Sequence, residues 1–231
     1  MTTLREIASD LLGMYRSAYK VTDAPDIRYL YFWIQSMRAK FIKQRLQRIS
    51  TFPVEDVTVQ SLGTLNLENV ADPYILGIPD DRFLKRTTQT IPEPIEINKS
   101  LGALTQIRLT ENPIADQYHK ANSILPYISY DRAPFAGSGK FNETDIFAFR
   151  HNNRIHVLSK YDYNDNITEI SVSGIFLNPL EVEDMTVDSP YPISKAILED
   201  IKAAIMQINF ESTMQQIEDK ITDGQNNIAQ P

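Results

Sequence analysis

Residues 146–158 read IFAFRHNNRIHVL, and this stretch decides the fold class. Apolar and aromatic residues fill positions 146–149 and recur at 155–158, and a His-Asn-Asn-Arg loop separates the two runs. Short runs of this kind on either side of a polar turn predict a β-hairpin. The chain therefore has a strand-forming segment well inside its sequence.

The surrounding sequence, from residue 52 to residue 182, has the same character. Prolines are frequent there, β-branched and aromatic residues alternate, and no long helical period is found. We expect further strands at residues 88–97, 103–109 and 167–177. Pro92 and Pro94 confine the first of these to a sheet edge or a bulge, because proline cannot donate a ladder hydrogen bond.

Toward both ends of the chain, apolar residues recur at helical spacing. Thr3 and Glu6 form a capping-box pair, and apolar residues then recur at helical spacing over residues 4–19. The same spacing returns after Ser194, which is a candidate N-cap. These patterns predict a helix at each end.

A second helix is predicted at about residues 26–48, with Asp23 as a candidate cap. Its apolar stripe follows one face, but Phe32 and Trp33 widen the apolar surface beyond that face. We therefore expect the helix to pack on two sides.

Together these predictions give an α+β fold, in which terminal helices form a helical bundle and the middle of the chain is a β-rich insertion. We expect residues 1–50 and 190–222 to make the helical bundle domain. Residues 51–189 are then the inserted domain, a sheet or barrel, and residues 223–231 are a polar, flexible tail.

Composition narrows the class of protein. The chain has 231 residues, 42% of them apolar, which is enough for a proper core. It has no cysteine, which removes disulfides, thiol nucleophiles and thiolate metal sites. No apolar run is long enough to span a bilayer and the amino terminus has no signal pattern, so we expect no membrane contact and synthesis in a cytosol-like compartment.

The net charge of −7 is distributed unevenly. Residues 1–48 hold nine Lys or Arg against four acids, a net +5, whereas residues 181–231 hold ten acids against three Lys, a net −7. A basic beginning and an acidic end suggest complementary surfaces. We expect the basic second helix to face acidic surface from the carboxy-terminal half, of the same or a neighbouring subunit.

Two local patterns resemble ligand-binding motifs, but each lacks residues that its motif requires. Residues 137–140, Gly-Ser-Gly-Lys, lack the upstream glycine and the following Ser or Thr of a phosphate-binding loop, which favours a flexible turn. Asp162, Asn164 and Asn166 imitate the opening of a calcium loop, but the required glycine and bidentate Glu are missing. A hairpin connection is the favoured interpretation there.

We expect no catalytic, metal-binding or cofactor-binding residues and no cofactor. His119, His151 and His156 are not at ligand spacing, and no nucleophile elbow is present, although a convergent triad stays open. The basic stretch at residues 38–48 could contact phosphates, with nearby aromatic residues stacking on bases. The whole chain is acidic and carries no nucleic-acid-binding signature, which favours a solvated face or a protein interface.

The segment at residues 130–142, YDRAPFAGSGKFN, is the most distinctive in the chain. It resembles a motif of virion structural proteins of tailed bacteriophages, specifically the neck or tail ring (head-tail connector) proteins of crAss-like podoviruses. Residues 26–44 are similar to the second helix of that family, and Tyr191-Pro192-Ile193-Ser194 with Ile201-Lys202 resembles the start of its last helix. The similarity runs from the first helix to about Ile208, and the role of residues 211–231 stays open.

The resemblance implies a virion structural protein, a ring-forming head-tail connector (adaptor) subunit that surrounds the DNA channel between portal and tail. The implied partners are the chain itself in a ring of twelve copies, the portal, neighbouring neck or tail ring proteins, and genomic DNA that passes without sequence-specific binding. The resemblance also implies that the protein is not an enzyme. It would be made in the host cytoplasm and located in the neck or tail of the virion.

Three other functions stay open at this point. One is another virion role, such as a tail-hub or head-completion protein. A second is a nucleic-acid-binding accessory protein that uses the basic second helix, which salt-sensitive DNA binding would favour. The third is an enzyme of unrecognised type, which a deep pocket with several titratable groups would favour.

We expect the loop at residues 132–141 to make assembly contacts. Proline stiffens such a loop, glycines permit backbone shapes closed to other residues, and Phe135 could bury in a neighbour or equally in the protein's own core. The assembly-contact candidates are Trp33, Arg38, Lys43, Arg45, Arg132, Pro134, Phe135, Gly137 and Gly139.

Overall fold

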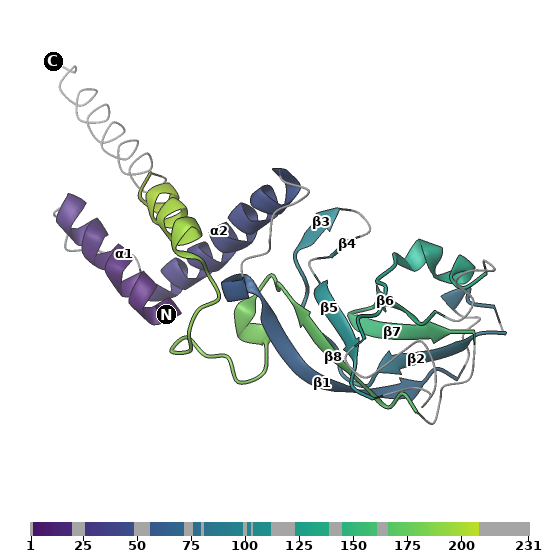
Figure 1. The fold of residues 1–231 in the computed structure, drawn as a ribbon. Coiled ribbons are helices and arrows are strands. Elements are labelled where there is room, and N and C mark those ends of the chain that lie inside the picture. Colours follow the sequence, from purple (N-terminus) through teal and green to yellow (C-terminus); the bar gives the residue numbers. More distant parts are fainter. Residues whose placement is uncertain are drawn as a thin grey trace, which may run out of the picture. The chain divides into compact units, whose positions relative to one another are not determined.

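The computed structural model describes residues 2–19, 26–48, 56–71, 76–79, 81–98, 101–102, 104–111, 123–138, 145–160 and 166–207. It divides into two compact units. Unit 1 comprises Met1–Ile42 and Val187–Pro231, and unit 2 comprises Lys43–Thr186. Helices occupy both ends of the described chain and an antiparallel sheet lies between them in sequence, which confirms the α+β class (Figure 1).

In unit 1, α1 (Leu4–Tyr19) begins with the predicted capping box. The Thr3 N–H donates to Glu6 Oε2 at 3.0 Å, and the Glu6 N–H donates to Thr3 Oγ1 at 3.1 Å. Two N–H groups that the first helical turn leaves without an intrahelical acceptor are satisfied in this way. The buried face follows helical spacing and consists of Leu4, Ile7, Ala8 and Leu11.

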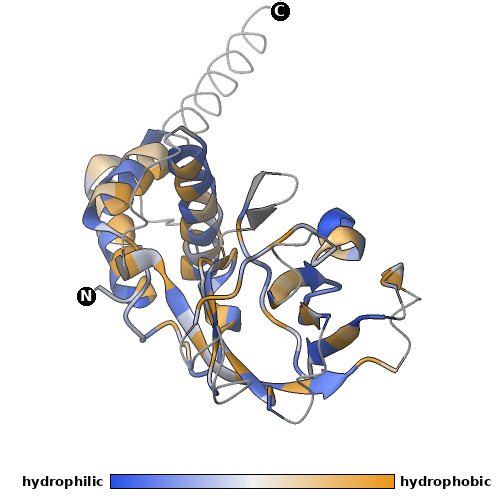
Figure 2. Ribbon diagram, turned by 45° about the vertical axis from the view of Figure 1, so that its right-hand side comes forward, coloured by the Kyte–Doolittle hydropathy of each residue, from blue (hydrophilic) through white to orange (hydrophobic). Residues whose placement is uncertain are grey.

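The second helix, α2 (Ile27–Arg48), takes Asp26 as its cap. The Arg28 N–H donates to Asp26 Oδ1 at 3.0 Å, and Asp23 lies outside the described residues. Residues 195–207 form a further helix, whose predicted cap is confirmed because the Ile197 N–H donates to Ser194 Oγ at 3.4 Å. Figure 2 shows the helices banded in orange and blue, as apolar and polar residues alternate along them.

Backbone hydrogen bonds join the start of the chain to the segment before the last helix. The Tyr191 N–H donates to the Thr2 carbonyl at 3.0 Å, and the Arg5 N–H donates to the Val187 carbonyl at 3.1 Å. The Arg5 guanidinium also lies 3.0 Å from the Asp188 carboxylate. These contacts explain why the two ends of the sequence share one unit.

Unit 2 is built on a six-stranded antiparallel sheet with the order β5-β8-β1-β2-β7-β6. Its strands are β1 (Gln60–Asn69), β2 (Phe83–Thr87), β5 (Leu104–Leu109), β6 (Phe147–His151), β7 (Arg154–Ser159) and β8 (Glu169–Gly174). A separate pair consists of β3 (Glu96–Asn98) and β4 (Leu101–Gly102), and short 3-10 turns are η1 (Asp56–Thr58), η3 (Tyr130–Phe135) and η4 (Pro179–Glu181).

The predicted hairpin is confirmed as β6 and β7. Phe147 pairs with Leu158, and the register continues to His151 opposite Arg154. The turn residues Asn152 and Asn153 have φ of 48° and 56°. A two-residue turn with positive φ at both positions matches the twist of a hairpin, and asparagine tolerates that conformation better than most residues.

The two edge strands of the sheet, β5 and β6, are both bonded to residues 123–128. On one side the Leu125 N–H donates to the Ile107 carbonyl at 2.8 Å. On the other side the Ala148 N–H donates to the Pro126 carbonyl at 2.9 Å. This segment therefore links both edges and satisfies backbone groups that open edges would leave free for other chains.

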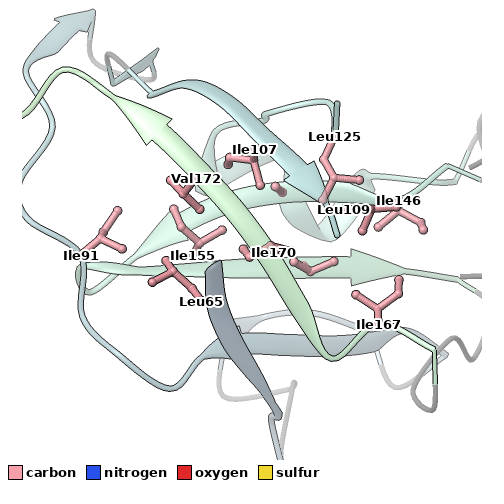
Figure 3. Packing of buried hydrophobic residues seen from close by; sticks show 12 residues of the cluster. Leu65, Ile91, Ile107, Leu109, Leu125, Ile146, Ile155, Ile167, Ile170 and Val172 are labelled. Atoms are coloured by element: carbon pink, nitrogen blue, oxygen red, sulfur yellow. The ribbon is translucent and has the colours of Figure 1, made fainter. Parts of the chain in front are cut away.

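One apolar cluster is built mainly from side chains of the six-stranded sheet (Figure 3). It receives alternate residues of β8, Ile170 and Val172, as expected where one face of a strand is buried. Burying a side chain of this size contributes about 1.5–3 kcal/mol. The cluster consists of Leu65, Ile91, Ile107, Leu109, Leu125, Ile146, Ala148, Ile155, Val157, Ile167, Ile170 and Val172.

The strand expected at residues 88–97 is wrong for most of its length. Only its end enters β3, and Pro94 makes an isolated bridge with Phe176. The Ile91 N–H donates instead to the Asn153 carbonyl in the hairpin turn at 2.7 Å. Two prolines without N–H groups leave the segment too few donors for a continuous ladder.

Candidate assembly surfaces

The distinctive segment from residue 130 forms η3, a 3-10 turn with one side in the core and one in solvent. Ala133 is 1% exposed, whereas Phe135 is 74% exposed. Pro134 is half-buried, and Arg132, three residues before Phe135, is exposed. Phe135 therefore does not fill the core of this chain, although a phenylalanine in water is unfavourable unless a partner covers it.

Contacts at both ends hold η3 in place. The Tyr130 ring stacks on His151 of β6 at a centroid distance of 4.4 Å, and its hydroxyl donates to the Leu76 carbonyl at 3.1 Å. Arg82, which is buried, donates to the Gly137 carbonyl at 3.4 Å and to Ser138 Oγ at 3.3 Å. Phe135 thus projects from a clamped backbone.

The second residue after this turn favours glycine for a backbone reason. Gly137 has φ of 70°, the left-handed region in which a Cβ is disfavoured, and it is buried. Gly139, the other glycine of the predicted loop, lies outside the described residues, as do Lys140 and Phe141. The described part of the Gly-Ser-Gly-Lys pattern follows a 3-10 turn, which is unlike the strand-to-helix setting of a phosphate-binding loop.

Arg38 was expected to be a surface contact, and the structure corrects this. Its exposed fraction is 0%, its Nε donates to the Pro192 carbonyl at 2.8 Å, and its guanidinium lies 5.8 Å from the centre of the Tyr191 ring. Burial lowers the pKa of Arg38 to about 10 and raises that of Tyr191 to about 12. Arg38 joins α2 to the segment before the last helix and is not available at the surface of unit 1.

The other candidates on α2 lie nearer the surface. Lys43 is exposed, while Trp33 and Arg45 are half-buried. The sequence interpretation missed a more exposed aromatic pair, since Tyr29 is 64% and Phe32 is 65% exposed. Their spacing of three residues could have indicated one helix face, but apolar residues occur all around this helix and gave no clear boundary.

The histidines that the structure describes belong to an aromatic cluster around β6 and β7. His156 is buried and stacks on Phe149 at 4.9 Å, and burial lowers its pKa to about 4. His119, Asp162 and Asn164 lie outside the described residues. Within the described ranges no group of three or more His, Asp or Glu side chains could hold a metal ion, and no described helix is long and apolar enough to cross a membrane.

Comparison with known proteins gave one family. The family described as Phage tail ring protein 2 (CrAss_Ring_2) matches residues 6–229, which is nearly the whole chain and includes both α2 and η3. No curated protein matches the sequence.

Proposed function

This chain belongs to the phage tail ring protein 2 family, and we propose that its ring serves as the head-tail connector between portal and tail. Membership makes it a structural component of the virion that assembles in a ring with other tail components. The proposal adds the position of the ring, a copy number of twelve, and contact with the portal and the neighbouring rings.

The observation that carries the proposal is the clamped, solvent-exposed Phe135. A connector subunit must bind the next copy in its ring and also the adjoining ring, so it needs separate contact surfaces. Aromatic side chains on a preorganised backbone are the usual anchors of such contacts, because little freedom is lost on binding. Phe135, with Arg132 and Pro134 beside it in η3, fits the contact to an adjoining ring.

Net charge supports passage of DNA through the ring. The chain carries −7 at pH 7 and has a pI of about 5.0. A strongly basic lumen would retain the genome through its phosphates, whereas an acidic subunit favours movement. In this proposal DNA contacts are transient and independent of sequence.

The position of the ring can be tested by electron microscopy of purified virions. We expect density for both units, fitted as separate bodies, in a ring of twelve copies directly below the portal. A ring at the distal tail would contradict the connector role and support a tail-hub function. A ring at the head opening without tail contacts would support a head-completion function.

The role of Phe135 can be tested by complementing a phage that lacks this protein with variants. Phe135→Ala should leave the melting temperature nearly unchanged and lower incorporation into particles by more than about tenfold, as loss of a central aromatic anchor does. Ile124→Ala is the matched control, since Ile124 is 55% exposed on the same unit and outside η3. Normal particle assembly with Phe135→Ala would rule out this contact.

A further inference from the structure

α2 carries only basic charged residues, and the segment around Glu181, Glu183 and Asp184, which we call the acidic segment, carries only acidic ones. Residues 27–54 contain no Asp or Glu, and α2 carries six Lys or Arg. Residues 161–194 contain no Lys or Arg and seven Asp or Glu. Long stretches of a single sign gain most from facing the opposite sign in a neighbour.

The exposed lysines of α2 share one side of the helix with its exposed aromatic pair. Tyr29, Phe32, Ser36, Lys40 and Lys43 are all exposed, and steps of three or four residues place them on one side, which we call the outer face. Leu30, Ile34, Arg38 and Ile42 are buried on the opposite side, and the small Ala39 is buried at the border of the outer face. The outer face is therefore continuous, apolar at one end and basic at the other.

The acidic segment is exposed at the residues that could meet this face. Glu181, Glu183 and Asp184 are exposed, and Asp184 has φ of 64°. Asp188 is set aside because it already pairs with Arg5 at 3.0 Å. In the helix at residues 195–207, Glu199 is already paired, since the Lys202 ammonium lies 3.9 Å from its carboxylate.

We propose that the outer face of α2 binds the acidic segment around Glu181 and Glu183 of the next copy of this chain in the ring. A ring needs a head-to-tail contact between two different surfaces of identical subunits, and these two surfaces differ in both place and charge. Tyr29 and Phe32 supply the apolar part of the contact, and Lys40 and Lys43 set its direction by charge.

Paired charge reversals test this contact in complemented virions. In the variant with Lys40→Glu and Lys43→Glu, both contact surfaces of each subunit are acidic. In the variant with Glu181→Lys and Glu183→Lys, both contact surfaces are basic. Each double variant alone should lower ring incorporation by more than about tenfold, because like charges then meet at every contact. Asp184 is left unchanged, since lysine is disfavoured at a positive φ.

The two defective variants should restore assembly when they are supplied together. In a ring that alternates them, every contact again joins an acidic surface to a basic one. Only a contact between separate chains can be restored by mixing two polypeptides. Arg16→Glu with Lys195→Glu is the matched control, because both residues are exposed in unit 1 and the net charge changes equally.

Every other outcome overturns the inference. Normal incorporation of either double variant would remove the contact, and failure of the mixture, with both variants folded by melting temperature, would show that the two surfaces do not meet. If Lys40→Glu with Lys43→Glu lost only salt-sensitive DNA binding, α2 would be a nucleic-acid surface. The inference rests on ring assembly, so a ring found elsewhere in the tail would overturn the connector role alone.

Discussion

α2 and η3 both expose aromatic side chains, but they hold them differently. On α2, Tyr29 and Phe32 lie on the outer face of a regular helix, in line with exposed lysines. On η3, Phe135 stands at the end of a short turn that Arg82 and Tyr130 fix in place. A helix face offers a broad contact guided by charge, whereas a clamped turn offers a single anchor for a pocket.

The same two regions reverse the usual relation between residue type and burial. Arg38 of α2 is 0% exposed, and Phe135 of η3 is 74% exposed. Arg38 can be buried because a carbonyl and an aromatic ring meet its guanidinium, and Phe135 is exposed because Ala133 takes the core-facing position of the turn. Neighbours, rather than polarity, decide which side chain meets water.

The largest expected effect on stability is a difference between two phenylalanines of unit 2. Phe149 is fully buried in the cluster beneath η3, so Phe149→Ala should lower the free energy of unfolding by about 3–5 kcal/mol. Phe135→Ala should change it by less than about 0.5 kcal/mol, because its ring is already in water. Chemical denaturation measures both. Equal losses would mean that Phe135 is part of the core.

The next largest effect on stability is a difference between two basic residues of α2. Arg38→Ala leaves a cavity and an unpaired Pro192 carbonyl, and it should cost about 2–4 kcal/mol of unfolding free energy. Lys43→Ala, on the exposed side, should cost less than about 0.5 kcal/mol. Denaturation of the two variants at the same pH measures the difference. A neutral Arg38→Ala would show that the buried guanidinium does not stabilise unit 1.

A smaller effect tests the backbone that holds Phe135. Gly137→Ala places a Cβ at a φ of 70° and should cost about 1–2 kcal/mol of unfolding free energy. Gly13→Ala should instead raise that free energy by about 0.5–1 kcal/mol, since Gly13 is inside α1 with open space around it. Thermal unfolding of both variants would show opposite signs. A stabilising Gly137→Ala would contradict the strained turn.

The last prediction is a pH dependence of stability next to η3. Burial lowers the pKa of His156 from 6.5 to about 4, so the unfolded chain binds a proton in this range that the folded chain does not. The contribution of His156 to stability is full above pH 6.5 and is lost as the pH falls toward 4. Melting temperatures of the wild type and His156→Gln should therefore converge as the pH is lowered over this window. His151→Gln is the control, and parallel profiles for wild type and His156→Gln would refute the prediction.

Features fixed by neighbouring residues could be predicted from the sequence. The capping box of α1, the cap at Ser194 and the β6-β7 hairpin depend on positions a few residues apart, and all three are confirmed. β1 and β2 were missed. β1 carries few large apolar residues and a glycine at φ 70°, and it is a strand because it pairs with β8, more than 100 residues later in the chain.

The candidate site divides in the same way. Sequence alone determined that residues 130–142 are distinctive, that α2 is basic and that the carboxy-terminal part is acidic, because these are properties of composition. Only the tertiary structure decided that Arg38 is buried, that Phe135 is exposed and that the side of α2 with Tyr29, Phe32, Lys40 and Lys43 faces solvent. The physical reason is that burial depends on which segments pack against a residue, and those segments come from distant parts of the chain.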